Sequence, residues 1–461
     1  MSGPDVTSMR PGVPAGQTEG RGRPLLSVEE ARDQVLAAID GPLEAEQVPV
    51  GAALGRVVAE DVVAATSLPP WDNSAMDGYA LRAADTSDAT DLVPRLLRVV
   101  GEVRAGSAPD VTVEPGTAVR IATGAPIPPD ADAVVPVEDT TPVDRSETRG
   151  SRGRDASGPL PHQVDVHVVV QPGGAIRRAG SDLIAGSIVL PAGSVITPAA
   201  VALVAGAGVP EVGVHRRPRV AVLATGDEVR AAGEPLGPAG IPDANRPGLL
   251  AQVVATGAEP IDLGIAGDRL QDALARLRDG LERDADAIIV SGGVSVGPYD
   301  VVKTAFESIG RIDLWRVAVQ PGKPFAFGTA DRPGGGRPVL LFGLPGNPVS
   351  SVVTFELFVR PALRRLAGHR RLLRPFDRAV LGDPVEKSHG RRAFIRVVVE
   401  RDEHDRPVRD ERGRLRARLA GGQGSHVLSA LAAADALAVI PEADDALPAG
   451  AEVALWWLDD R

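Results

Sequence analysis

Apolar strand-like runs alternate with helix-like runs from residue 217 to residue 370, and this alternation limits the possible folds most strongly. RVAVLA at 219–224 and AIIV at 287–290 are almost continuously apolar, whereas residues 268–284 repeat apolar side chains at helical spacing. Strands that are apolar on both sides need cover on both faces, and parallel sheets obtain that cover from crossover helices. The segment therefore predicts a three-layer α/β domain with a mostly parallel sheet.

The rest of the chain predicts a short helix and smaller, strand-rich domains. Ser27 and Glu30 form a capping-box pattern ahead of helically spaced apolar residues. Short valine-rich runs between 67 and 182 are broken by glycine and proline, and residues 371–461 return to strand-like runs. Residues 142–163 are polar and rich in turn formers, which predicts a long exposed loop or hairpin tip.

Charge and composition exclude several classes of function. The formal net charge is −11, whereas proteins that follow a nucleic acid or an anionic membrane normally present a basic face. The chain has no cysteine, which removes disulfides, thiolate nucleophiles and cysteine-ligated metals. Residues 1–24 have the composition of a disordered leader and lack a signal-peptide apolar region. We expect a soluble, cytoplasmic protein with no nucleic-acid and no membrane partner.

Glycine- and proline-rich loops follow the predicted strands of the α/β segment. Ligands of open α/β sheets bind beyond the carboxyl ends of the strands, and glycines there let backbone N–H groups approach an anion. Any one of these loops could be an ordinary turn, but several on one edge, together with acids and Lys323, favour a single anion pocket. Its predicted loops are Ser291–Gly297, Gln320–Pro324 and Leu344–Ser350.

Acidic residues in the same segment suggest a magnesium site. Mg²⁺ binds through a few carboxylates together with substrate phosphates. Asp268 and Asp300 could instead be helix N-caps, and Asp243 could form an Asx turn. The acids at predicted strand ends or helix starts are Asp227, Glu228, Asp243, Asp268 and Asp300.

A further polar group lies in the predicted β domain, in the run WDNSAMDGYA at 71–80. Thr123, Glu138 and Asp182 extend it, although a structural turn would also use such residues. The chain has no G-x-x-x-x-G-K-[ST] loop, and Gly206-Ala207-Gly208 does not continue as a dinucleotide fingerprint. Neither Walker-type ATP hydrolysis nor hydride transfer fits the sequence.

Seven motifs, in the same order along the chain, resemble the MoeA family of molybdopterin molybdenumtransferases, which includes the C-terminal domain of gephyrin. The resemblance runs from about residue 25 to the end. The motifs are DNSAMDGYA at 72–80, RIATGAPIP at 120–128, ADAVV at 131–135, TGDE at 225–228, SGGVSVG at 291–297, PGKPFAFG at 321–328 and GLPGNPVS at 343–350.

The resemblance implies a reaction and a domain plan. Such enzymes insert molybdate into adenylated molybdopterin, with Mg²⁺-dependent release of AMP, and work as homodimers whose active cleft combines two subunits. Other cofactor-biosynthesis proteins or molybdoenzymes are further candidate partners. The implied domains are a leader at 1–24, a linker and dimerisation domain at 25–66 and 183–214, an inserted β domain at 67–182, a MogA-like α/β domain at 215–370 and a C-terminal β-barrel at 371–461.

The resemblance also implies roles for individual residues. Asp268 and Asp300 would hold Mg²⁺ at the nucleotide end, and Asp77 and Thr123 would reach across the dimer cleft. The expected catalytic residues are Asp77, Thr123, Asp182, Glu228, Asp268, Asp300 and Lys323. The expected substrate-binding residues are Ser291, Gly292, Gly293, Ser295, Gln320, Pro321, Pro345, Gly346, Asn347, Pro348, Ser350, Arg391, Arg396 and Ser425.

Two positions depart from the family pattern, and two other functions remain open. Many members carry lysine where this chain has Arg316 and Gln320. Gln320 lacks the positive charge, so oxyanion binding is expected to depend more on Lys323 and the loop amides. The alternatives are a MogA-type molybdopterin adenylyltransferase, which would share the α/β domain, and a non-catalytic scaffold like that of gephyrin.

Overall fold

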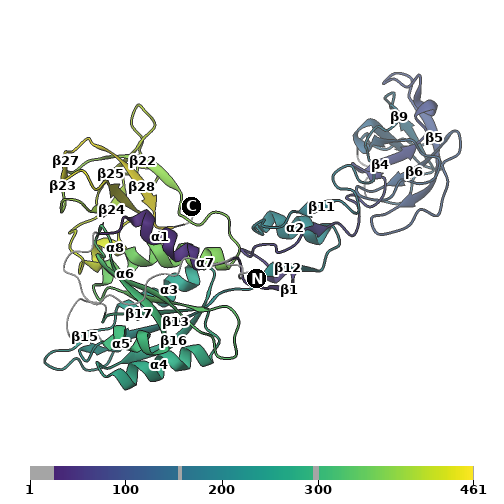
Figure 1. Cartoon of the computed structure of the whole chain (residues 1–461). Helices are drawn as coiled ribbons and strands as arrows, with labels where there is room; N and C mark the ends of the chain where they lie inside the picture. The colour runs from purple at the N-terminus through teal and green to yellow at the C-terminus, as the bar shows by residue number, and fades with distance from the viewer. Residues whose placement is uncertain (1–24, 154–157, 294–300, 460–461) are drawn as a thin grey trace, which may run out of the picture. The chain divides into compact units, whose positions relative to one another are not determined.

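The computed structural model describes residues 25–153, 158–293 and 301–459, which form two compact units (Figure 1). Unit 1 lies within Met1–Leu43 and Arg217–Arg461, and unit 2 is Glu44–Arg216. Ser295 and Asp300 lie outside the described residues. Within those residues, no helix combines the length and the apolarity needed to span a bilayer.

A six-stranded sheet forms the centre of the α/β part of unit 1. Its strands are β13 (Arg219–Thr225), β16 (Glu259–Ala266), β17 (Ala287–Ser291), β18 (Gly310–Arg316), β20 (Pro324–Ala330) and β21 (Val339–Leu344). They follow the order β16-β13-β17-β21-β20-β18, and all except β20 run in one direction. The predicted mostly parallel sheet is confirmed. The antiparallel strand β20 is absent from the sequence prediction.

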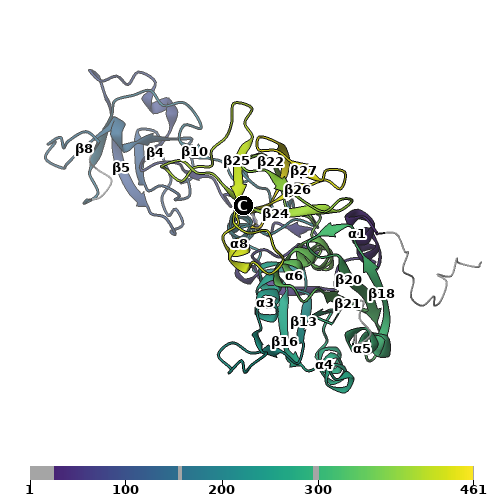
Figure 2. The ribbon, with the colours of Figure 1, turned by 90° about the vertical axis from the view of Figure 1, so that its left-hand side faces the viewer.

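Helices cover both faces of this sheet (Figures 1 and 2). They are α1 (Val28–Ala37), α3 (Asn245–Ala255), α4 (Leu270–Glu282), α5 (Val301–Ile309), α6 (Pro348–Thr354) and α7 (Arg360–Leu366). Val222 and Ile289 pack on one face with α1, α3, α6 and α7, whereas Leu223 and Ile288 pack on the other with α4 and α5. The strands read as continuous apolar runs because both faces are buried.

The C-terminal part of unit 1 is a closed barrel. Its elements are β19 (Val319–Gln320), β22 (Phe376–Leu381), β24 (Arg392–Val399), β25 (Leu415–Leu419), α8 (Leu428–Ala432), β26 (Ala436–Ile440) and β28 (Glu452–Trp457). The order β24-β25-β22-β28-β26 closes because β26 also pairs with β24. β19 adds to β24 in parallel. The loop between β19 and β20 is therefore fixed by the barrel on one side and the α/β sheet on the other.

Both units also contain short strand pairs. In unit 1 they are β14 (Val229–Arg230) with β15 (Ile241–Pro242), and β23 (Val385–Glu386) with β27 (Ala446–Leu447). In unit 2 they are β1 (Ala45–Pro49) with β12 (Glu211–His215), β2 (Val62–Val63) with β11 (Ile188–Leu190), and β3 (Asn73–Ser74) with β10 (Ile176–Arg177). Unit 2 also contains helix α2 (Pro198–Gly206).

Unit 2 has its own six-stranded sheet and its own apolar clusters. The strands are β4 (Gly78–Leu81), β5 (Arg95–Val103), β6 (Thr117–Ile121), β7 (Ala133–Pro136), β8 (Thr140–Val143) and β9 (Gln163–Val166), in the order β7-β4-β6-β5-β9-β8. β8 and β9 pair antiparallel, so the long polar segment between them is a hairpin connection, as predicted.

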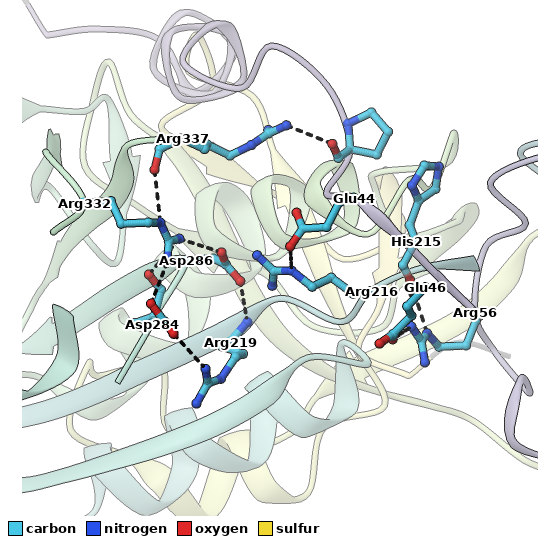
Figure 3. A network of polar contacts seen from close by, with 12 residues as sticks. Glu44, Glu46, Arg56, His215, Arg216, Arg219, Asp284, Asp286, Arg332 and Arg337 are labelled. Atoms are coloured by element: carbon cyan, nitrogen blue, oxygen red, sulfur yellow. Dashed lines mark hydrogen bonds and ion pairs between the residues drawn. The ribbon is translucent and has the colours of Figure 1, made fainter. Parts of the chain in front are cut away.

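The chain passes between the units at Leu43–Glu44 and at Arg216–Arg217. Charged side chains bind the segments on each side of these two points (Figure 3). In unit 1, Asp286 accepts hydrogen bonds from the Arg219 backbone at 2.9 Å and from Arg332 at 2.8 Å. Arg337 donates to the carbonyls of Gly41 and Pro42. In unit 2, Arg216 pairs with Glu44, and Arg56 pairs with Glu46 and donates to the His215 carbonyl at 2.8 Å. Each crossing segment is thus anchored within its own unit.

Candidate active site

The loops that follow the parallel strands meet at the carboxyl edge of the unit 1 sheet. Gly292 donates its backbone N–H to the Leu344 carbonyl at 3.2 Å, and Gly226 donates to the Ala266 carbonyl at the same distance. Thr225 Oγ1 lies 3.4 Å from the Ser291 carbonyl oxygen. The ends of β13, β16, β17 and β21 are therefore joined directly. We call these loops, together with residues 320–324, the carboxyl-edge site.

Two glycines after β17 are required by space and by backbone conformation. Gly292 and Gly293 have φ of 96° and 63°, a region that side chains with a Cβ rarely adopt. A Cβ on Gly292 would lie 2.8 Å from the Thr225 carbonyl oxygen, and one on Gly293 would lie 2.4 Å from Val302 Cγ2. The loop can pass this close to its neighbours only as glycine.

Asp227 and Asp268 lie side by side at one end of the site. The Asp268 N–H donates to Asp227 Oδ1 at 3.1 Å, and the Asp227 N–H donates to Asp268 Oδ2 at 3.3 Å. Each carboxylate keeps its other oxygen without a partner among the described residues. The nearby Glu228 carboxylate lies against Gly226. Two adjacent carboxylates with free oxygens suit Mg²⁺, which completes its coordination with water and phosphate.

Two of the alternative structural roles can be decided from the contacts. Asp268 does not cap α4, because the N-cap position is Arg269 and its side chain makes no capping bond. Asp243 does have a structural role: it accepts the Arg246 backbone N–H at 3.0 Å and the Arg246 Nε–H at 2.8 Å. Arg246 also pairs with Asp262. Asp243 therefore binds Arg246 at the start of α3.

The opposite end of the site is basic. Burial of the Lys323 ammonium, and then the positive charges of Arg316 and Arg391, lower the pKa of Lys323 from its usual value. The guanidinium groups of Arg316 and Arg391 therefore lie within electrostatic range of the Lys323 ammonium. Gly322 has φ of 112° and lets the loop pass close to α6. A Cβ added at this position would lie 2.6 Å from Thr354 Cγ2. An anion placed here would relieve the repulsion among the cations.

Gln320 has a specific contact of its own. Its side-chain oxygen accepts the backbone N–H of Ser388 at 2.9 Å, and the Gln320 backbone lies in β19, paired with β24. Ser388 belongs to the turn that precedes β24. The amide thus links the beginning of the loop between β19 and β20 to the barrel, a link that a lysine side chain, which carries only donors, would not make.

Arg396 on β24 is buried without a carboxylate partner among the described residues. It is only 1% exposed, and burial lowers its pKa. Its Nη2 donates to the carbonyls of Gly422 and Gly424 at 3.0 and 3.1 Å, while its Nε has no partner. The next residue, Ser425, accepts the Val349 N–H at 3.1 Å through its carbonyl. Arg396 therefore positions the Ser425 loop against the start of α6, and none of the carboxylates in the described part of the chain pairs with its charge.

The predicted residues of unit 2 lie on its surface. Asp77 Oδ1 accepts both the backbone N–H of Thr123 at 2.7 Å and its hydroxyl at 2.9 Å, and both residues are exposed. Asp72 accepts the Ala179 N–H at 2.8 Å and pairs with Arg178, and these bonds lower its pKa. Asp72 therefore joins the DNSAMDG motif to the segment that leads to Asp182, which is also exposed.

Asn245 is missing from the residues predicted from the sequence, although it connects two of the site's loops. Its side-chain nitrogen donates to Ser291 Oγ at 2.8 Å and to the Gly346 carbonyl at 2.7 Å. Asn245 is the first residue of α3, immediately beyond the carboxyl edge. That position, a polar amide at a helix start beside the predicted pocket, is the signal that could have identified it.

Three family models match this chain, and together they span almost its whole length. Residues 26–208 match the MoeA N-terminal region (domain I and II), residues 221–365 match a probable molybdopterin binding domain, and residues 378–458 match the MoeA C-terminal region (domain IV). The loops of the carboxyl-edge site all lie within the segment that matches the probable molybdopterin binding domain.

Individual relatives and solved structures point the same way. Molybdopterin molybdenumtransferase 2 of Mycobacterium tuberculosis is 39% identical over 438 residues, which cover 94% of this chain and 99% of that protein. Molybdopterin molybdenumtransferase of Haemophilus influenzae is 33% identical over 432 residues, with 94% and 98% covered. A crystal structure of a molybdopterin biosynthesis MoeA protein from Pyrococcus horikoshii is 29% identical with a TM-score of 0.72, covering 94% of this chain and 99% of that one. The chain therefore belongs to the MoeA family of molybdopterin molybdenumtransferases.

Proposed function

We propose that the protein inserts molybdate into adenylated molybdopterin, with Mg²⁺-dependent release of AMP. Family membership supports the reaction class, because the relatives are named for it and match nearly their full length. The observation that carries the assignment to this site is that one sheet edge has an acidic end, at Asp227 and Asp268, and a basic end, at Lys323, whose pKa is lowered by burial and by the charges of Arg316 and Arg391.

The acidic end is proposed to hold the nucleotide. Asp268, with Asp300 as second ligand, would bind Mg²⁺, and the contacts of Asp227 make it a third candidate. When bound, the metal ion supplies charge neutralisation to the phosphates. Glu228, at the end of the loop that follows β13, is proposed to face the pterin.

The basic end is proposed to hold the oxyanion. Lys323 and Arg396 would bind molybdate, and the backbone N–H of Gly293 would stabilise the charge that develops on the phosphoanhydride. Molybdate carries its own oxygen nucleophile, so its attack on phosphorus needs no nucleophile from the protein. The remaining proposed contacts are Ser291, Ser295, Pro321, Pro345, Gly346, Asn347, Pro348, Ser350 and Ser425.

Release of AMP tests this function directly. The purified protein, given adenylated molybdopterin, Mg²⁺ and molybdate, is expected to release AMP only when molybdate is present. Omission of Mg²⁺ is expected to slow the release strongly, because the phosphate charge is then not neutralised. Equal release without molybdate would refute the coupled mechanism, and consumption of ATP with free molybdopterin would favour an adenylyltransferase.

An acid variant separates enzyme from scaffold. Asp300→Asn is expected to lower the rate of AMP release by at least about a hundredfold, because a carboxylate ligand is lost beside the phosphates. The oligomeric state is expected to stay unchanged. A variant that assembles normally and keeps full activity would contradict the metal role and favour a scaffold. The comparisons do not favour either alternative, since the match to the molybdenumtransferases extends beyond the α/β domain.

A homodimer is proposed to complete the site, with Asp77 and Thr123 contributed by the second subunit. Its support is an apolar surface on unit 2. Val63 on β2 lies directly opposite Ile188 on β11, and these side chains are 48% and 54% exposed. The adjacent helix α2, PAAVALVAG, is apolar all round. Single helices and strand pairs with this composition are normally covered.

Light scattering tests the dimer. The protein is expected to have twice the mass of one chain, and Ile188→Asp is expected to yield monomers because it buries a charge in the contact. Leu92→Asp is the matched control: Leu92 is 94% exposed on another part of unit 2. A dimer that tolerates Ile188→Asp as well as Leu92→Asp would place the contact elsewhere. We also propose a cytoplasmic location, where a reducing environment protects the dithiolene of the substrate.

A further inference from the structure

The Asn245 side chain forms hydrogen bonds to residues at two strand ends of the carboxyl-edge site. Its Nδ2 donates to Ser291 Oγ at the end of β17 and to the Gly346 carbonyl after β21. The carbonyl oxygen can only accept, so the amide orientation is determined and Nδ2 must face it. The Asn245 Oδ1 is then turned the other way, where it is buried with no donor among the described residues.

These two bonds decide which way the neighbouring groups can donate. Ser291 Oγ uses a lone pair to accept from Asn245, so its own hydrogen remains free to donate elsewhere. The Gly346 carbonyl faces Asn245, and in a trans peptide the following N–H points in the opposite direction. The N–H of Asn347 is therefore turned away from α3. The Asn245 side chain thus orients two hydrogen-bond donors, the Ser291 hydroxyl and the Asn347 N–H.

We infer that Asn245 is a positioning residue that commits the Ser291 hydroxyl and the Gly346–Asn347 peptide to donate hydrogen bonds to a phosphate of the substrate. This inference rests on the proposed function, because it takes the carboxyl-edge site to be the phosphate site. Donors fixed before the ligand arrives need no reorganisation when negative charge develops. Asn245 itself does not touch the reacting atoms.

Two substitutions at Asn245 test the role. Asn245→Ala removes both hydrogen bonds, and Asn245→Asp keeps the shape while removing the donors. The new carboxylate would repel the Gly346 carbonyl and accept the Ser291 hydrogen, so the hydroxyl would be reversed. Both variants are expected to bind AMP and inorganic phosphate about tenfold more weakly in calorimetry, the effect of losing one good hydrogen bond to a charged group.

Gln252 on the same helix provides a matched control. Its side-chain nitrogen donates to Glu356 at 3.1 Å, and its Oε1 is also buried without a donor. Gln252→Ala is expected to lower Tm without changing the affinity for AMP or phosphate. A second check is the pair Asn245→Ala and Ser291→Ala, whose combined loss of affinity is expected to be smaller than the sum of the single losses.

The outcomes distinguish this inference from the proposed function. Unchanged phosphate and AMP affinity in Asn245→Asp would overturn the positioning role. The role would also be overturned if Asn245→Ala and Gln252→Ala both lost affinity in proportion to their decrease in Tm. If the unaltered protein binds phosphate but releases no AMP with molybdate, the proposed reaction fails while the affinity comparison still decides the role of Asn245. Additive losses for Asn245→Ala and Ser291→Ala would overturn the action through Ser291.

Discussion

At the scale of single residues, Gln320 is the position where the site's charge can be increased by one substitution. The side chain accepts a hydrogen bond from the Ser388 N–H, and Lys323 follows it in the same loop. Gln320→Lys exchanges that hydrogen bond for a positive charge beside a proposed oxyanion. The change in oxyanion affinity therefore compares two effects of the substitution: the gain of a positive charge and the loss of the hydrogen bond to Ser388.

Gln320→Lys is expected to tighten molybdate and tungstate binding by up to about tenfold, or about 1.4 kcal/mol, measured by calorimetry. Gln320→Met is the control, because it removes the bond to Ser388 without adding charge, and it is expected to weaken binding slightly. Equal or weaker binding by Gln320→Lys would show that the Ser388 contact outweighs the charge.

The lowered pKa of Lys323 predicts a pH dependence of anion binding. An oxyanion binds the protonated lysine, so affinity is full below the pKa and falls as the pH rises through it. Because burial and the cations Arg316 and Arg391 lower this pKa, the fall is expected to begin at a lower pH than for an ordinary lysine. Calorimetry with molybdate between about pH 7 and 10 measures it.

Lys323→Arg is the informative comparison for this pH dependence. Arginine keeps its charge throughout that range, so the variant's affinity is expected to vary much less with pH. A pH profile as steep as that of the unaltered protein would assign the titration to another group. Lys323→Met is expected to bind weakly at every pH.

At the scale of elements, the loop between β19 and β20 depends on its closeness to α6. Gly322→Ala is expected to lower both stability and molybdate affinity, since φ of 112° is strained for alanine and the new Cβ would meet Thr354 Cγ2 at 2.6 Å. Addition of Thr354→Ser, which removes that methyl group, is expected to restore part of the loss. Chemical denaturation and calorimetry measure the two effects.

Gly390→Ala serves as the control for the strain alone. Gly390 also has a positive φ, of 68°, but nothing lies within 4 Å of its added Cβ. Its substitution is expected to cost about 1 kcal/mol of stability and to leave molybdate affinity unchanged. If Gly322→Ala has no larger effect than Gly390→Ala, the contact with α6 does not hold the loop.

Elements of the α/β part are largely predictable, and the exceptions have physical reasons. The strands β13, β17 and β21 read as apolar runs because both of their faces are covered. The predicted capping box is confirmed, with Ser27 and Glu30 each accepting the other's backbone N–H. β20 follows the glycine–proline loop so closely that its sequence reads as part of that loop. The pairing of β19 with the barrel is a long-range contact, which no local pattern reports.

At the scale of the whole molecule, unit 2 is one continuous segment whose ends meet. The Arg216 N–H donates to the Glu44 carbonyl at 3.0 Å, and their side chains also pair. Segment 44–216, which contains its own apolar clusters, is expected to fold alone with a cooperative thermal transition. Glu44→Ala is expected to weaken the closure and lower the Tm of the isolated segment, measured by calorimetry.

Failure of the isolated segment to fold would show that it depends on unit 1. Asp85→Ala is a comparison within the same segment, because Asp85 accepts the Gly116 N–H at 2.9 Å away from the crossing points. It is expected to lower Tm only slightly, as exposed hydrogen bonds contribute little. A smaller effect from Glu44→Ala than from Asp85→Ala would contradict the importance of the paired ends.

The sequence by itself determined the layered α/β fold, the loops at its carboxyl edge and the family, because periodicity, glycine-rich loops and ordered motifs are local properties of the chain. The tertiary structure decided which polar groups are already engaged. It assigned Asp243 to Arg246, joined Asp227 to Asp268 and, within the residues that the structure describes, gave the buried Arg396 no carboxylate partner. It also brought Asn245 against Ser291, 46 residues away along the chain. Such pairings follow from packing between distant segments, whose geometry no single stretch of sequence contains.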